Sequence, residues 1–220
     1  MPPKPQQGIE KCSKVKGVMK TRGMQWTSMF MLLLLTALAQ TPAPRNTDID
    51  PALLAKANAG DPAAQVQVGD SNRAAGDGLA LTPKQASEYY KLAAAWYLKA
   101  AEQGSVVGQM RLAEFYRDGK GVARDLGQAA EWYRKAAEQG DVTAQGALGV
   151  LYSFGQGVAQ DYVEAYYWLD LAASVKGPNQ EKYAANRQMV GTHITAGELA
   201  DVQEREAKWL AEHPRGGGTP

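Results

Sequence analysis

One stretch of this chain occurs three times, as AAAWYLKAAEQG at Ala93–Gly104, as AAEWYRKAAEQG at Ala129–Gly140 and, less faithfully, as AYYWLDLAASVK at Ala165–Lys176. The tryptophans of the three copies are 36 residues apart: Trp96, Trp132 and Trp168. A repeat of this length is one supersecondary unit that cannot bury its apolar face alone, so neighbouring units stack into a continuous core. The sequence therefore predicts a solenoid, an architecture that presents an extended binding surface.

Each regular unit has the pattern of two helices. Repeat 2 spans 105–140 and repeat 3 spans 141–176. In the first half of each unit a small, a branched and an aromatic residue are four positions apart, which places them on one helical face. These residues are Gly108, Leu112 and Tyr116 in repeat 2, and Ala144, Leu148 and Tyr152 in repeat 3. We expect the core to contain Leu112, Leu148, Tyr116, Tyr152, Trp96, Trp132 and Trp168.

Turn and cap residues mark the ends of these helices. Ser105 and Asp141 are expected N-caps, and the loops GKGV and GQGV supply two glycines to each hairpin. Four residue pairs fit the capping box, in which the N-cap and the third helical residue bond each other's backbone. These pairs are Thr82 with Gln85, Asp125 with Gln128, Asp161 with Glu164, and Thr195 with Glu198. The fold class predicted is all-α.

The units at the two ends of the array are irregular. Repeat 1 spans 61–104, eight residues more than its successors, and we expect the extra length to extend its second helix. Residues 50–60 are predicted to form an N-terminal capping half-repeat, and 177–213 to form C-terminal capping helices. The tail 214–220, which is rich in glycine and proline, is expected to be disordered.

The first 39 residues have the features of an export signal. Basic residues precede the apolar run Met29–Leu38, and the sequence Ala-Leu-Ala before Gln40 fits a cleavage site. An uncleaved membrane anchor is the alternative, although the run is shorter than the ~20 residues that span a bilayer. A start at Met19 would give a signal peptide of ordinary proportions, and 40–49 would be a flexible linker. We expect an exported chain, periplasmic or secreted, with no stable membrane insertion after cleavage.

Charge and composition argue against several kinds of chemistry. The residues after position 39 contain 18 of the 24 Lys and Arg and 22 of the 23 Asp and Glu, so their net charge of −4 disfavours nucleic acid. Cys12 is the only cysteine and precedes the predicted cleavage site. His193 and His213 are the only histidines and lie in no metal motif. We predict no catalytic residue, no metal and no cofactor.

Two segments carry a resemblance to a known family. Ala144–Asp161 has the pattern A-Q-x-x-L-G-x-L-Y-x-x-G-x-G-V-x-x-D, and Ala129–Gly140 has A-x-x-W-Y-x-K-A-A-E-Q-G. These patterns resemble the Sel-one-like repeat, a relative of the tetratricopeptide repeat, over about Asp61–Lys176. The resemblance implies a right-handed superhelix of antiparallel helix pairs that acts as a scaffold or adaptor for protein–protein contacts. Members with catalytic claims are mostly cysteine-rich, and this chain lacks that pattern.

Candidate binding residues are aromatic side chains at positions where a repeat departs from its neighbours. In repeat 3, Tyr166 and Tyr167 replace an alanine and a glutamate of repeat 2. One interpretation is that the closing helices bury Tyr167; the other is an exposed patch that anchors a peptide or stacks on a sugar ring. The full candidate set is Phe154, Tyr162, Tyr166, Tyr167, Tyr89 and Tyr90, the last two with the same two interpretations.

Three functional hypotheses follow from these features. The first is a non-catalytic adaptor of the bacterial envelope that binds an unidentified protein or peptide. The second is a cell-wall or carbohydrate-binding module, suggested by the unmatched tyrosines. The third is a cell-wall hydrolase or β-lactamase-like enzyme, for which the sequence offers no evident nucleophile.

Overall fold

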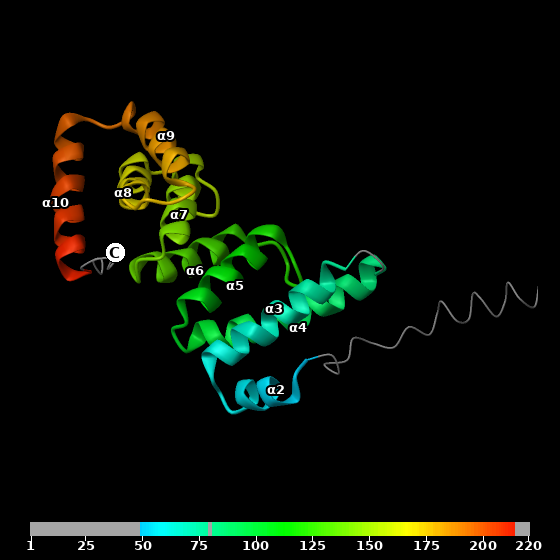
Figure 1. Cartoon of the computed structure of the whole chain (residues 1–220). Coiled ribbons are helices and arrows are strands. Elements are labelled where there is room, and N and C mark those ends of the chain that lie inside the picture. The colour runs from blue at the N-terminus through cyan, green and yellow to red at the C-terminus, as the bar shows by residue number, and fades with distance from the viewer. Residues whose placement is uncertain (1–48, 79–80, 214–220) are drawn as a thin grey trace, which may run out of the picture. The chain divides into compact units, whose positions relative to one another are not determined.

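Nine α-helices, and no strand, make up the part of the chain that the computed structural model describes, residues 49–78 and 81–213 (Figure 1). The helices are α2 (Pro51–Asn58), α3 (Pro62–Gly76), α4 (Pro83–Glu102), α5 (Val106–Asp118), α6 (Leu126–Glu138), α7 (Val142–Phe154), α8 (Tyr162–Ala173), α9 (Gln180–Gly191) and α10 (Ala196–Glu212). The expected signal peptide (1–39), linker (40–49, apart from Ile49) and tail (214–220) lie outside the described residues.

The helices from α3 to α8 form three consecutive antiparallel pairs, α3 with α4, α5 with α6, and α7 with α8 (Figure 1). Each pair also packs on the next, through α4 and α5 and then through α6 and α7. At the ends, α2 packs on α3, and both α9 and α10 pack on α8. The predicted all-α solenoid is confirmed.

Side-chain caps begin the first helix of each pair. The Asp61, Ser105 and Asp141 side chains each accept a hydrogen bond from a backbone N–H in the first turn. This satisfies donors that a helix start would otherwise leave without a partner. The two positive-φ glycines of each hairpin loop are present as predicted: Gly119 and Gly121, then Gly155 and Gly157.

Only two of the four predicted capping boxes are complete, those of Thr82 with Gln85 and Thr195 with Glu198. The prediction is wrong for Asp125 and Asp161, which cap their helices while the third helical residue bonds elsewhere. The Glu164 carboxylate instead accepts a hydrogen bond from Trp168 Nε1 at 3.1 Å and pairs with Arg205. The Glu164 side chain therefore pairs with Arg205 of α10 instead of completing the capping box with Asp161.

The deepest aromatic position lies one residue after each tryptophan of repeats 1 and 2. Tyr97 and Tyr133 have exposed fractions of 0% and 1%, and Leu169, the matching residue of repeat 3, is equally buried. In the first helix of repeats 2 and 3, the buried residue lies one position before the tyrosine that was expected in the core. Phe115, which precedes Tyr116, and Leu151, which precedes Tyr152, are both buried. The core of each pair is therefore built on these positions and on the alanines that surround them.

This placement corrects part of the expected core. Leu112 and Leu148 are fully buried, and Trp96 and Trp168 are nearly so. The interior position expected for Trp132, Tyr116 and Tyr152 is wrong: all three are half-buried against the edge of the core. Lys135 Nζ lies 3.9 Å from the Trp132 ring centroid, so a cation covers the outer face of this ring. An amphipathic aromatic is stable at such an edge because its polar atom stays near water.

Buried glutamines connect successive helix pairs. The Nε2 groups of three of them donate to backbone carbonyls of the preceding helix or its end: Gln65 to Ala57, Gln109 to Ala101 and Gln145 to Ala137. The Gln65 and Gln109 Oε1 atoms each accept a further hydrogen bond, from Gln103 and Gln139 respectively, both at 2.8 Å. In repeat 3 the position that corresponds to Gln103 and Gln139 is held by Val175, which has no side-chain donor. Gln145 Oε1 accordingly has no hydrogen-bond partner among the described residues.

Substituting Val175→Gln is expected to stabilise the protein by about 1 kcal/mol, because a buried acceptor without a partner is unfavourable and a typical hydrogen bond contributes about that amount. The increase is to be measured by urea unfolding followed by circular dichroism. The matched control is Val175→Leu, which supplies no donor and is expected to leave the midpoint unchanged. Equal midpoints for the glutamine and leucine variants would contradict the prediction.

The last helix, α10, covers the second helix of repeat 3. Tyr167 has an exposed fraction of only 3%, and the Arg205 guanidinium lies 3.9 Å from its ring centroid. Arg205 also pairs with Glu164, and Val202 of α10 is buried in the same cluster as Tyr167 and Trp168. The interpretation that the closing helices bury Tyr167 is confirmed.

Candidate functional site

The six candidate aromatic residues do not form one site. Tyr167 is buried beneath α10, so its ring is unavailable to a peptide or a sugar. Tyr89 and Tyr90 lie on α4, in a different helix pair from the rest. The Tyr90 hydroxyl donates to Asp77 at 2.7 Å, which lowers the pKa of that carboxyl, and its ring meets Phe115 edge-on. Tyr90 therefore has a structural role.

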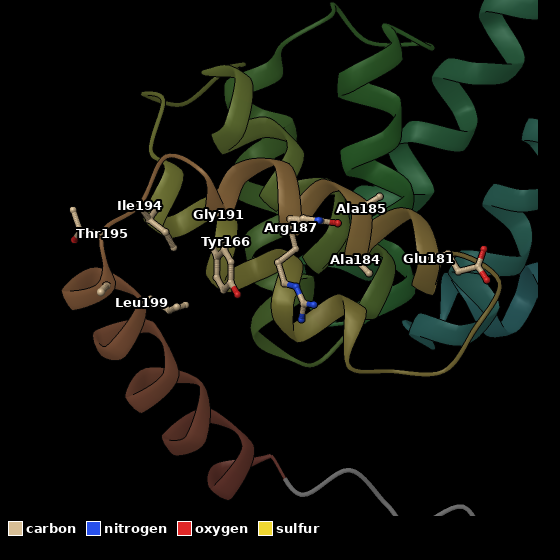
Figure 2. Close-up of a pocket in the computed structure, with 11 residues that line it drawn as sticks. Tyr166, Glu181, Ala184, Ala185, Arg187, Gly191, Ile194, Thr195 and Leu199 are labelled. Carbon is tan, nitrogen blue, oxygen red and sulfur yellow. The ribbon is translucent and has the colours of Figure 1, made fainter.

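Tyr166 lines an open hollow of about 610 Å³ between α8, α9 and the start of α10. Figure 2 shows Ile194 and Leu199 on one side of its ring and Arg187 on the other. Arg187 pairs with Asp170 of α8, and burial raises the pKa of the Tyr166 hydroxyl. The ion pair of Arg187 thus joins α9 to α8 at this end of the helix stack.

Phe154 and Tyr162 lie together in a smaller cleft formed by the ends of α7 and α9 and the start of α8. Phe154 is 60% exposed and Met189 is 50% exposed, and the Tyr162 ring stacks on His193 with the centroids 4.3 Å apart. The cleft measures about 150 Å³. We call it the aromatic cleft; its lining residues include Phe154, Tyr162, Met189, Val190 and His193.

A third depression, of about 270 Å³, lies between α7 and α9 and also borders Arg117 of α5 and Tyr133 of α6. Its only charged lining residues are Arg117 and Lys182, and no carboxylate contributes to its lining. Arg117 donates to the Tyr133 hydroxyl at 3.2 Å and pairs with Asp118 at 2.7 Å. We call it the α7–α9 groove; its lining residues include Arg117, Thr143, Ala147, Val150, Lys182 and Tyr183.

The groove and the aromatic cleft share one face of each bordering helix. On α7, Thr143, Ala147, Val150 and Phe154 follow each other at spacings of four, three and four residues, which is the spacing of one helical face. On α9, Lys182 and Met189 are seven residues apart, or about two turns. The two depressions therefore follow one another along the same face of α7 and of α9.

The same face is charged in repeat 2. The residues 36 positions earlier on α5 are Val107, Arg111, Glu114 and Asp118. Arg111 pairs with Glu114 at 3.2 Å, and Asp118 pairs with the neighbouring Arg117. Repeat 3 thus replaces a set of ion-paired side chains by alanine, valine and phenylalanine on a face that remains accessible.

Other kinds of site find little support in the part of the chain that the structure describes. Residues 49–78 and 81–213 contain no group of three or more His, Cys, Asp and Glu side chains placed to hold a metal ion. Both histidines stack on aromatic rings, His193 on Tyr162 and His213 on Trp209. None of the described helices is long and apolar enough to cross a membrane.

The sequence alone predicted that Phe154 and Tyr162 belong to a binding surface. It did not indicate Ala147, Val150 or the α9 residues of this surface. A comparison of Ala147 and Val150 with Arg111 and Glu114 would have identified the α7 face. Lys182, Tyr183 and Met189 lie beyond the regular repeats, so no matching residue in another unit gives a comparison.

Comparisons with known proteins agree with this architecture. The crystal structure of c5321, a protective antigen of uropathogenic Escherichia coli strains with an SLR fold, is 34% identical, with a TM-score of 0.60, over 72% of this chain and 32% of that chain. A Sel1 repeat protein from Oxalobacter formigenes is also 34% identical, with a TM-score of 0.50, over 60% and 49%. The chain thus spans less than half the length of either protein. No curated protein matches it.

The sequence model of the Sel1 repeat matches the three helix pairs, at residues 62–105, 106–141 and 142–174. These matches cover more than half of the chain, in phase with the repeats seen in the sequence and in the structure. The chain therefore belongs to the Sel1 repeat family.

Proposed function

We propose that this chain is an exported, non-catalytic adaptor of the bacterial envelope that binds a segment of a partner protein along the α7–α9 groove. Sel1 repeat proteins are generally scaffolds for protein–protein interaction. The observation that carries the proposal is the α7 face, where Ala147, Val150 and Phe154 replace the charged residues of repeat 2. Accessible apolar surface of this kind, next to polar groups, is typical of interaction sites.

The export part of the proposal is supported by the sequence of the first 39 residues. Basic residues, a short apolar run and a small-residue site before Gln40 follow one another in the order of a signal peptide. The mature chain would have no cysteine, so it would need no disulfide in an oxidising compartment. Stability would then come from the packing of the helices alone.

Site-specific photo-crosslinking in intact cells tests both parts. A photoreactive phenylalanine at position 147 lies in the groove, and the same residue at the exposed position 131, on α6, is the control. We expect position 147, but not position 131, to give a discrete protein adduct that fractionates with the periplasm or envelope and contains a chain beginning at Gln40. The same adducts from both positions, or none from position 147, would contradict the groove as the binding site.

A further inference from the structure

We infer that the α7–α9 groove selects an extended partner segment in which an acidic residue lies three positions from a large apolar side chain. The apolar side chain enters the aromatic cleft, and the carboxylate pairs with Lys182 at the rim of the groove. This inference rests on the proposed function, because it specifies the partner chemistry of the same surface.

The aromatic cleft has the size and lining for one apolar side chain. A cavity of about 150 Å³ accommodates a benzene-sized group. Only three large apolar side chains are strongly exposed within residues 49–78 and 81–213, and two of them, Phe154 and Met189, lie at this cleft. In repeat 2 the position of Phe154 is held by Asp118, which is ion-paired. Covering Phe154 and Met189 would remove apolar surface from water without disturbing the core.

The charged groups that line the groove beside the cleft are both basic. The residues after position 39 carry a net charge of −4, yet Arg117 and Lys182 are the only charged groups in the lining. Arg117 is already paired with Asp118, whereas Lys182 is exposed and makes no ion pair with another described residue. A carboxylate of the partner is the group that complements this rim.

The distance between Lys182 and Met189 on α9 determines how far apart the acidic and the apolar residue lie in the partner segment. Lys182 and Met189 are seven residues apart on a helix that rises 1.5 Å per residue, so they are separated by about 10 Å along the axis. A partner segment in the extended polyproline II conformation has three residues per turn and rises about 3.1 Å per residue. Side chains three positions apart therefore lie on the same side of it, about 9 Å from each other, which is close to the separation on α9. A segment with an Asp or Glu three positions from a Leu, Met, Phe or Trp therefore reaches both subsites.

The experiment uses displayed random ten-residue peptides selected on the full chain. We expect the enriched peptides to carry the acidic residue and the large apolar residue at this spacing. The dissociation constant of the most enriched peptide is then measured by fluorescence anisotropy with substituted chains. Phe154→Ala, Met189→Ala and Lys182→Glu are each expected to weaken binding at least tenfold, and added salt to weaken binding to the unsubstituted chain more than binding to Lys182→Glu.

Two controls match these substitutions. Val107→Ala removes the third exposed apolar side chain, which lies on α5, and Lys208→Glu reverses an exposed charge on α10. Both are expected to change the dissociation constant less than twofold. Because the three test residues are exposed, circular dichroism of every variant is expected to match the unsubstituted chain.

The outcomes separate this inference from the proposed function. Enriched peptides without the acidic and apolar pair, or equal affinities for the test and control variants, would overturn the inference while an adduct from position 147 would still support the adaptor. If no peptide is enriched, the inference is overturned as well, and crosslinking from position 147 decides the proposed function separately.

Discussion

Replacing Tyr133 with alanine is expected to lower the free energy of unfolding by about 3–5 kcal/mol, as for other large-to-small changes in a core. The ring has an exposed fraction of 1% and packs among the alanines of α6, and its hydroxyl accepts a hydrogen bond from Arg117. Burial also raises the pKa of this hydroxyl above its ordinary value, because the charged form would be poorly solvated there. The loss is to be measured by urea unfolding followed by circular dichroism.

Two neighbouring substitutions define the register of the core. Trp132→Ala is expected to lose only about 1–2 kcal/mol, because this ring is half-buried at the edge and gives up less contact. Glu131→Ala is expected to change stability by less than about 0.5 kcal/mol, since the side chain is exposed. A loss for Trp132→Ala as large as that for Tyr133→Ala would show that the tryptophan, and not the tyrosine, is the interior residue.

Replacing Gly157 with alanine is expected to destabilise the protein by about 2–5 kcal/mol. Gly157 has a φ of +74°, a left-handed conformation that costs an L-residue about 1–2 kcal/mol. A Cβ at this position would also overlap the backbone of Leu126 and Gly127, where the loop of repeat 3 lies against the start of α6. That overlap adds about 1–3 kcal/mol, as in other overpacked sites. Thermal unfolding measures the loss.

Gly140→Ala is the matched control for this loop. Gly140 also has a positive φ, of +91°, but a Cβ there would meet only the Trp209 ring, at an ordinary distance of 3.7 Å. Its loss is therefore expected to be about 1–2 kcal/mol, from backbone strain alone. Equal losses for the two glycines would show that the contact between the loop and α6 contributes nothing.

The repeated parts of the fold could be predicted because several copies carry the same signals. The 36-residue spacing, the caps Ser105 and Asp141 and the paired loop glycines each recur in sequence and structure. The choice between Trp132 and Tyr133 could not be made from periodicity. Adjacent residues lie 100° apart on a helix, and alanines flank both, so packing of neighbouring helices decides which side faces inward. Leu169 was the available hint, since repeat 3 has an aliphatic residue there.

The candidate site was predictable only in part, for a related reason. Phe154 and Tyr162 stood out because the matching residues of repeat 2 are Asp118 and Leu126. Tyr167 stood out equally but is covered by α10, a helix outside the repeats whose docking depends on Arg205 and Glu164. A residue that differs from its counterparts in the other repeats therefore indicates that its surroundings have changed. Only the structure shows whether that residue makes a new internal contact, as Tyr167 does, or lies on the accessible surface, as Phe154 does.

Methionine methyl NMR of the full chain, titrated with the most enriched peptide, tests most directly that the partner segment lies on the surface of α7 and α9. Met189 lines the aromatic cleft, whereas Met110 is half-buried on α5 and serves as an internal control. We expect the Met189 methyl resonance to shift in proportion to binding and the Met110 resonance to stay in place. A shift of the Met110 resonance with an unchanged Met189 resonance, at saturating peptide, would contradict binding on the surface of α7 and α9.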